Sequence, residues 1–197
     1  MWTLGRSAVM KGQDVLLLFK MASLQTQKEV NDEQDSPALE RWSDRYSLRS
    51  LSDSLGISKS EVSNSIIRCR NSGLLTNDYQ TSLPKVNRDE LLNITEYALK
   101  YFFPVKPGAL TRGIPTGFAS PVLTQHLKSA GNQIIVWPDP QEKEKGQAVE
   151  PLYKTVAHAV KQDQTLYHYL ALVDAIRLGG PRERAVAVKL LKAGMRI

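Results

Sequence analysis

SLRSLSDSLGISKSEVSNSIIRCRNSGLL, residues 47–75, is the stretch that decides the fold. Three leucines at helical spacing line one face of a first short helix: Leu48, Leu51 and Leu55. Gly56 ends that helix, because glycine adopts the left-handed backbone at no steric cost. Ser58 and Glu61 form an S-x-x-E capping box, which marks the start of a second helix. The stretch therefore predicts two helices joined by a tight turn.

The second predicted helix has two chemically different faces. Its apolar face carries Val62, Ile66 and Cys69, and Gly73 ends the helix. Its other face carries short hydrogen-bonding side chains, one isoleucine and two cations: Lys59, Ser60, Ser63, Asn64, Ile67 and Arg68. Such a face suits the major groove of DNA, because amides and hydroxyls reach base edges and cations neutralise phosphate. The pattern predicts a DNA-recognition helix, and the alternative is an ordinary helical hairpin with a polar outer face.

A β-hairpin is predicted directly after this helix. Residues 74–76 and 81–86 form its strands, and Pro84 makes the second one an edge strand. A helix-turn-helix followed by a hairpin is the pattern of a winged helix. Residues 12–103 resemble the winged helix-turn-helix domain of bacterial transcription regulators, closest to the multiple-antibiotic-resistance regulator (MarR) type. The string G-I-S-K-S-x-V-S at residues 56–63 carries most of the resemblance. The resemblance implies a homodimer on a palindromic operator and, as in many members, a response to a small-molecule effector.

The predicted DNA-binding residues lie on both helices and at the base of the hairpin. They are Ser47, Arg49, Ser58, Lys59, Ser60, Ser63, Asn64, Arg68, Lys85 and Arg88. Asn64 and Ser63 are predicted to contact bases, whereas Lys59 and Arg68 are predicted mainly on phosphate. The predicted hairpin turn at residues 77–80, NDYQ, carries an acid and no arginine, which disfavours its insertion into a minor groove.

The flanking segments complete the predicted N-terminal domain. Residues 13–24 carry an apolar stripe of helical period, whereas residues 27–40 are polar and mostly acidic and predict a solvent loop. Two aromatic residues favour a short strand at 41–46. Asn87 and the glutamate three positions later cap a further helix that extends to residue 103.

The next stretch, PVKPGALTRGIPTGFASP at residues 104–121, contains four prolines and three glycines. This density argues against a helix or a central strand, and ordered loops of this length are often functional. One interpretation is a loop that positions Thr111 and Arg112 for an anion, either DNA phosphate or an acidic ligand. The other is an irregular connector between domains.

The remaining segments predict a mainly helical C-terminal region. They are a brief helix at 124–129, a strand at 134–137, and helices at 152–160, 166–178 and 182–193. The predicted fold class is therefore mainly α with a small β-hairpin wing. A winged helix-turn-helix domain spans residues 12–103, and residues 104–197 form a helical extension for dimerisation, partner or ligand binding.

Composition and charge limit the function further. The chain has 197 residues, a net charge of +6 and a single cysteine, so it forms no internal disulfide. Residues 104–197 alone carry 13 basic and 7 acidic groups, so the positive excess lies outside the predicted DNA-binding domain. The longest apolar run, residues 15–19, is far too short to span a bilayer, and the N-terminus lacks the order of a signal peptide. A cytoplasmic location without membrane contact is expected.

The case for catalysis in the sequence is poor, and it would need groups that meet only in the fold. His126, His158 and His168 lack metal-ligand spacing, and no phosphate-binding loop, dinucleotide turn or nucleophile elbow occurs. No enzyme activity, metal or cofactor is predicted. The leading hypothesis is a sequence-specific transcription regulator, a dimeric repressor that binds double-stranded DNA. The alternative is a protein-interaction module that uses its winged helix as a docking surface for a co-encoded partner.

Overall fold

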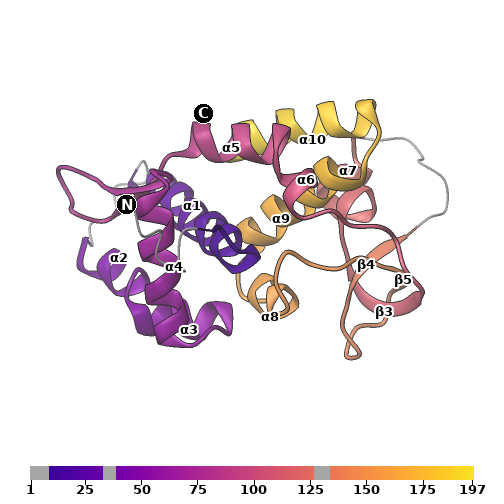
Figure 1. Cartoon of the computed structure of the whole chain (residues 1–197), viewed down its shortest axis with the longest axis horizontal. Helices are drawn as coiled ribbons and strands as arrows, with labels where there is room; N and C mark the ends of the chain where they lie inside the picture. Colours follow the sequence, from indigo (N-terminus) through magenta and orange to yellow (C-terminus); the bar gives the residue numbers. More distant parts are fainter. Residues whose placement is uncertain (1–8, 33–38, 127–133) are drawn as a thin grey trace, which may run out of the picture.

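The computed structural model describes residues 9–32, 39–126 and 134–197. It is mainly helical, with a two-stranded hairpin and a separate three-stranded sheet. Helix α1 (Gly12–Asp32) passes through the middle of the molecule, between a helical end formed by α2, α3 and α4 and a small barrel at the other end (Figure 1). Every residue from Gln13 to Leu24 is buried. A helix buried on all sides makes α1 the centre on which both halves pack.

Helix α1 is longer than the sequence predicted. It continues to Asp32, into the stretch predicted as a solvent loop from residue 27. Contacts with the hairpin and the start of the next helix hold this polar part: Gln25 accepts a hydrogen bond from the backbone N–H of Val86 at 2.8 Å, and Glu29 pairs with Arg88 at 2.9 Å. The rest of the predicted loop includes residues 33–38, which lie outside the described residues.

The predicted strand at residues 41–46 is wrong. This segment belongs to helix α2 (Leu39–Arg45). Trp42 and Tyr46 are both buried and lie four positions apart, a spacing that places them on one side of a helical turn. Aromatic character favours a strand only where a neighbouring strand pairs with it, and no strand pairs with this segment among the described residues.

The deciding stretch folds as predicted. Helix α3 (Leu48–Leu55) begins after Ser47, whose hydroxyl accepts from the N–H of Ser50, and ends at Gly56, which has a φ of 63°. Helix α4 (Lys59–Asn71) begins after Ser58, whose hydroxyl accepts from the N–H of Glu61. The hairpin follows, with β1 (Leu75–Asn77) antiparallel to β2 (Pro84–Val86).

Two short helices continue from the hairpin. Asn87 caps α5 (Arg88–Tyr97) by accepting from the N–H of Glu90, as predicted. The predicted single helix to residue 103 is interrupted at Ala98, where a second short helix, α6 (Leu99–Phe102), begins.

The C-terminal region contains more β-structure than predicted. Strand β3 (Leu110–Pro115) pairs antiparallel with both β4 (Ile135–Pro138) and β5 (Lys145–Ala148), which are parallel to each other and close a small barrel. The prediction that residues 104–121 contain no central strand is therefore wrong over β3, which is paired on both sides. Gly113 allows the close pairing, because a Cβ at this position would lie 1.9 Å from the carbonyl oxygen of Trp137.

Helices complete this half. They are η1 (Gly117–Ala119), α7 (Pro121–Thr124), α8 (Val156–Val160), α9 (Gln164–Leu178) and α10 (Pro181–Gly194). The helix predicted from residue 124 is wrong at its start, because α7 ends at Thr124 and residues 125–126 form a turn; the rest of that prediction, from residue 127, lies outside the described part. One cluster of buried apolar side chains extends from Val15 to Met195 and includes both Trp42 and Trp137. Among the described residues, no helix has the length and apolar character needed to cross a membrane.

Candidate nucleic-acid interface

The inner face of α4 is fixed to α1 by apolar and polar contacts. Val62 and Cys69 are buried in the core. Gln13 donates from its amide to Glu61 at 2.7 Å and to the hydroxyl of Ser65 at 3.1 Å. These contacts fix the rotation of α4 about its own axis, and therefore decide which side chains point outward.

The outer face of α4 is open to solvent. Its exposed residues are Lys59, Ser60, Asn64, Ile67, Arg70 and Asn71, and Ser63 is half-buried at its edge. The spacing of residues 60, 64, 67 and 71 defines one continuous stripe along the helix. The packing of α4 is chiefly against α1, α3 and β1, and the barrel lies at the far end of the molecule (Figure 1). The stripe therefore has the room that a large partner needs.

Arg68, predicted to contact phosphate, lies on the inner face instead. Its guanidinium forms two hydrogen bonds with the carboxylate of Asp14, at 2.8 and 2.7 Å. The side chains are only 7% and 0% exposed. The hydrogen bonds that Arg68 donates to Asp14 raise the pKa of Arg68, so this charge is permanent and already paired. Placing Arg68 on the DNA-facing surface was wrong, because it follows Ser65 by three positions on the buried side.

Asn64 occupies the centre of the outer stripe. Its amide donates a long hydrogen bond of 3.5 Å to Glu61. Glu61 is held ionised, since the hydrogen bonds from Gln13 and Asn64 lower its pKa. The amide of Asn64 is thus oriented from one side, while the rest of the side chain stays free for a partner.

The other predicted contact residues divide into free groups and occupied groups. Ser47 and Ser58 serve as helix caps. Arg88 is paired with Glu29 through both terminal nitrogens, at 3.0 and 2.9 Å, which removes it from the set of free cations. Arg49 and Lys85 are exposed, although Lys85 lies 3.6 Å from Asp78.

Arg70 is a candidate that the sequence reading missed. It is exposed in the last turn of α4, and its guanidinium donates to the side-chain oxygen of Asn77 on the hairpin at 3.1 Å. Helical spacing gives the signal that could have found it, because residue 70 follows Ile67 by three positions and Ser63 by seven. It supplies a cation at the position that Arg68 was expected to fill.

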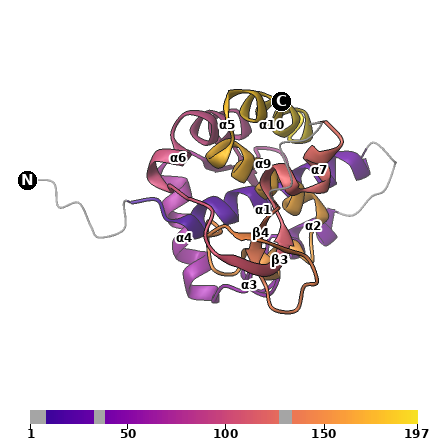
Figure 2. The same ribbon diagram turned by 90° about the vertical axis from the view of Figure 1, so that its right-hand side faces the viewer.

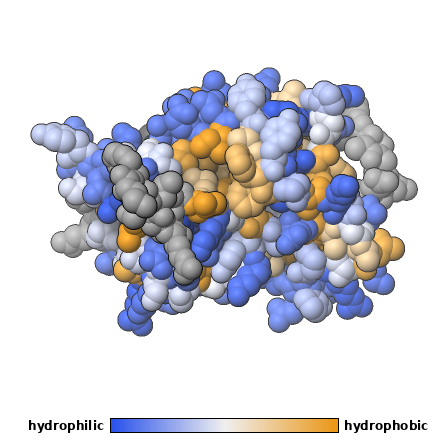
Figure 3. Space-filling view, viewed as in Figure 1, coloured by the Kyte–Doolittle hydropathy of each residue, from blue (hydrophilic) through white to orange (hydrophobic). Residues whose placement is uncertain are grey.

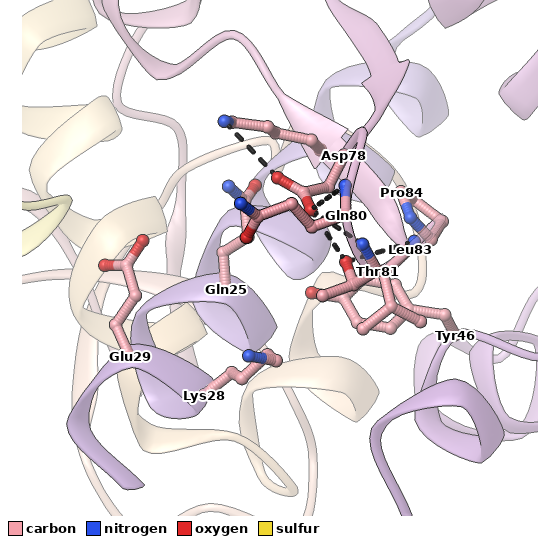
Figure 4. Close-up of a pocket in the computed structure, with 10 residues that line it drawn as sticks. Gln25, Lys28, Glu29, Tyr46, Asp78, Gln80, Thr81, Leu83 and Pro84 are labelled. Atoms are coloured by element: carbon pink, nitrogen blue, oxygen red, sulfur yellow. Dashed lines mark hydrogen bonds and ion pairs between the residues drawn. The ribbon is translucent and has the colours of Figure 1, made fainter. Parts of the chain in front are cut away.

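The acid in the hairpin turn has a structural role. One carboxylate oxygen of Asp78 accepts from the N–H of Gln80 at 3.1 Å and from the N–H and hydroxyl of Thr81, each at 3.0 Å (Figure 4). These bonds, chiefly those from Thr81, lower the pKa of Asp78. The turn presents Tyr79, which is fully exposed. Asp78 therefore shapes the hairpin tip.

Comparison of the chain with family models, with curated proteins and with solved structures gives no significant match. The outer face of α4 is therefore interpreted from its own geometry.

A cavity of about 220 Å³ lies between α1, Tyr46 and the hairpin (Figure 4). Six of its ten lining residues belong to the hairpin segment: Asp78, Gln80, Thr81, Leu83, Pro84 and Lys85. Burial raises the pKa of Tyr46, which lines the opposite wall and stays protonated. Any molecule in this cavity would contact both α1 and the hairpin.

Thr111 and Arg112, predicted in an anion-binding loop, lie on the regular strand β3. Thr111 pairs with Gly146, and Arg112 pairs with Lys145 on β5. The hydroxyl of Thr111 donates to the carbonyl of Arg112 at 3.4 Å. Across the ranges that the structure describes, no group of three histidine, cysteine or acidic side chains could hold a metal ion.

Proposed function

We propose that this chain is a sequence-specific DNA-binding transcription regulator. In this proposal residues 12–103 act as a winged helix-turn-helix, and α4 is the recognition helix. The observation that carries the proposal is the outer stripe of α4, which is polar, exposed and held in a fixed rotation by the inner-face contacts with α1. A recognition helix needs both an accessible face and a rigid support.

The proposed contacts follow from side-chain chemistry. Asn64 forms hydrogen bonds with a base edge, and adenine is its usual bidentate partner. Ser60 and Ser63 are small enough to allow close approach. Ile67, which is 50% exposed, contacts a thymine methyl group. Three exposed cations bind phosphate in this proposal: Lys59, Arg70 and Lys85.

The same proposal covers the biological setting. A regulator of this kind acts in the cytoplasm as a homodimeric repressor on a palindromic operator. The cavity between α1 and the hairpin is the proposed place for a small effector, since an occupant would shift the hairpin relative to α4. Residues 104–197 support α1 from the other side.

The test is fluorescence anisotropy with DNA from the protein's own promoter region. Asn64→Ala is expected to weaken binding by about 1–3 kcal/mol and to relax specificity at one base pair. Asn93→Ala is the matched control, because Asn93 is exposed on α5, away from the stripe. Lys59→Ala should lower the salt slope of binding by about one unit, whereas Lys189→Ala on α10 should leave it unchanged.

The proposal that α4 is the recognition helix would be contradicted if Asn64→Ala and Lys59→Ala bound this DNA as tightly as the unmodified protein. The second candidate function is a docking module for a co-encoded protein, and the exposed Ile67 in the middle of the stripe favours it. Co-purification followed by a gel-shift assay separates the two. A stable protein complex without DNA affinity supports docking.

A further inference from the structure

A second pocket, of about 270 Å³, lies where α1, α2 and α3 meet the start of α9. We call it the α1–α3 pocket. Figure 2 shows α1 and α9 near the centre of the molecule and α2 and α3 toward its edge. The lining extends from the exposed Arg45 to the buried Asp163, so the pocket leads from the surface toward the middle of the fold. It shares no lining residue with the cavity between α1 and the hairpin.

The carboxylate of Asp163, at the buried end of the pocket, has its acceptor capacity filled. Four groups donate to it: Lys20 at 2.8 Å, Ser23 at 2.9 Å, the amide of Gln27 at 3.2 Å and the N–H of Leu166 at 3.0 Å. A carboxylate has about four lone-pair positions, so these donors occupy them. A ligand in the pocket therefore needs no donor for this acid.

The neighbouring Lys20 has donors to spare. Its ammonium forms one hydrogen bond to the described part of the chain, the bond to Asp163, although an ammonium carries three N–H donors. The side chain lines the pocket and is only 10% exposed, so the other donors have little access to bulk water. A buried cation with unused donors favours an anionic occupant, because an unpaired charge is costly to bury.

A second cation lies at the mouth of the pocket. Arg45, in the last turn of α2, is exposed, and its guanidinium lies 4.6 Å from the ring centroid of Trp42. One terminal nitrogen donates to the side-chain oxygen of Gln27 at 3.2 Å. These two contacts hold the guanidinium in place. Among the described residues, most of its five N–H donors have no partner, so they are available to a ligand.

The remaining walls are polar apart from one leucine. Helix α3 contributes Ser50 and Ser54, the segment before α9 contributes Gln162, and α1 contributes the buried Leu24. The hydroxyl of Ser50 accepts from that of Ser47 at 3.1 Å, which leaves its own O–H to donate into the pocket. Two cations and one acid are the charges of the lining. The excess is positive, and the acid is already covered by donors.

We propose that the α1–α3 pocket binds a phosphate group, carried by inorganic phosphate or by a small phosphorylated molecule. Its donors come from three helices: Lys20 on α1, Arg45 on α2 and Ser50 on α3. A tetrahedral phosphate presents oxygens in several directions, whereas a carboxylate has two oxygens in one plane. A phosphomonoester also carries a charge of about −1.5 to −2 at pH 7, which compensates two cations. This site goes beyond the proposed function and does not depend on it.

The size of the pocket selects a small ligand. Sites for drug-sized molecules enclose about 300–1,000 Å³, and this pocket is smaller. Lys20 lies at the buried end, so a phosphate fixed on the rigid helix of duplex DNA would reach Arg45 but not Lys20. Figure 3 shows mostly hydrophilic residues at the end of the molecule where Figure 1 draws α2 and α3. A free ion or a small phosphomonoester fits both the depth and the polarity of the site.

The test is isothermal titration calorimetry of the full chain with inorganic phosphate at constant ionic strength. The unmodified protein is expected to bind with a dissociation constant of about 1 mM or lower. Arg45→Ala should raise this constant about tenfold through the loss of a charge-assisted hydrogen bond, and Ser50→Ala should raise it about fivefold. Arg49→Ala is the matched control, because it removes the same charge from an exposed position of α3 outside the pocket and should leave binding unchanged.

Absence of saturable binding up to about 10 mM phosphate would overturn the proposal. Equal losses for Arg45→Ala and Arg49→Ala would overturn it too, because they would reduce the effect to the general charge of the protein. Acetate that binds as tightly as phosphate would overturn it in favour of a carboxylate. Glycerol 3-phosphate distinguishes the two sources of the group: tighter binding than phosphate supports a phosphorylated molecule, and weaker binding supports the free ion. If circular dichroism shows that Arg45→Ala does not fold, Ser50→Ala, which keeps every charge, decides the test.

Discussion

Arg68 and Asp14 show how a buried charged pair can hold helix α4 from inside. The pair is almost completely excluded from water, which carries a large desolvation penalty. Two hydrogen bonds between the charged groups offset part of this penalty, and Arg68 gains a third bond by donating to the hydroxyl of Ser65 at 3.0 Å. The same carboxylate accepts from the N–H of Lys11 at 2.8 Å. The pair therefore ties α4 to the start of α1 in one orientation.

Removal of Arg68 should be costly because Asp14 would be left buried and unpaired. We expect Arg68→Ala to lower the free energy of unfolding by about 3–5 kcal/mol. Replacing both partners, as in Asp14→Leu with Arg68→Met, should recover most of this loss. Arg70→Ala is the matched control, and its exposed side chain should contribute within about 0.5 kcal/mol. Urea denaturation measures all four proteins, and an Arg68→Ala protein as stable as Arg70→Ala would contradict the buried pairing.

Cys69 gives a pH dependence of stability with a definite sign. Burial raises its pKa to about 12, with a further increase from the nearby Asp14 carboxylate. In the unfolded chain the thiol ionises near its ordinary pKa of about 8.5. The folded pKa is the higher one. The contribution of the protonated thiol to the free energy of unfolding is therefore full well below pH 8.5 (about), and it is lost as the pH rises toward the folded pKa.

The measurement compares the unmodified protein with Cys69→Ala in urea at pH 7, 8, 9 and 10 (about these values). From pH 9 to pH 10 the stability of the unmodified protein should fall by about 1.4 kcal/mol more than that of the variant. Between pH 7 and pH 8 (about) their difference should change by only about 0.2 kcal/mol, because most of the unfolded thiol is still protonated there. Parallel profiles across the whole range would show that the thiol is accessible in the folded protein.

At the scale of elements, the α3–α4 turn is braced by the C-terminal half. Gly56 has a φ of 63° and lies against α8, where an added Cβ would be 3.1 Å from the ring of His158 and 3.5 Å from Thr155. One ring nitrogen of His158 also lies 3.1 Å from the carbonyl oxygen of Asp53 on α3. Helix α8 thus holds the turn that sets the angle of α4.

Comparing alanine substitutions at two glycines with positive φ distinguishes the contact with α8 from the cost of the left-handed backbone alone. Gly73 has a φ of 76°, and nothing lies within 4 Å of the Cβ that alanine would add. Gly73→Ala should therefore lower the free energy of unfolding only by the cost of the left-handed conformation for alanine, about 1–2 kcal/mol. Gly56→Ala should cost about 1 kcal/mol more, because the new methyl group meets α8. Thermal unfolding of both variants gives the comparison, and equal losses would mean that the α3–α4 turn is not held by α8.

Local signals predicted the elements whose boundaries depend on residues a few positions apart. Caps and spacing gave α3, α4, the hairpin and the start of α5, and helical periodicity gave α9 and α10. The errors occurred where distant contacts decide. Strand β3 exists because β4 and β5 pair with it on both sides, and proline density hides that pairing from the sequence.

The candidate site divides in the same way. Helical spacing alone placed Lys59, Ser60 and Asn64 on an exposed face. It could not assign Arg68, because the carboxylate that buries this residue lies 54 positions earlier in the chain. Arg88 was likewise predicted to contact phosphate. Nothing in the sequence indicated its pairing with Glu29, which lies 59 positions away. Helical periodicity cannot reveal ion pairs between residues that lie far apart in the sequence.

At the scale of the whole molecule, buried polar contacts join the two halves through α1. Asp163 caps α9 by accepting from the N–H of Leu166 at 3.0 Å. Its carboxylate also accepts from the ammonium of Lys20 at 2.8 Å and from the hydroxyl of Ser23 at 2.9 Å, both on α1. A second buried acid, Asp174, accepts from Trp137 of the barrel at 2.6 Å. The chain of contacts therefore runs from α1 through α9 to the barrel.

The continuous core predicts that residues 12–103 and 104–197 unfold together. The apolar cluster includes Trp42 near α3 and Trp137 in the barrel, so each indole reports on a different half. A two-state protein shows the same transition at every probe. We expect the fluorine NMR signals of fluorotryptophan at positions 42 and 137 to disappear at the same urea concentration, with assignments from Trp42→Phe and Trp137→Phe. Asp163→Ala removes the acceptor shared by α1 and α9 and leaves the Lys20 charge buried without its partner, so both midpoints should shift down together. If Trp137 kept its signal after Trp42 had lost its own, the barrel and α9 would form an independent folding unit, and α1 would be the core of the N-terminal half alone.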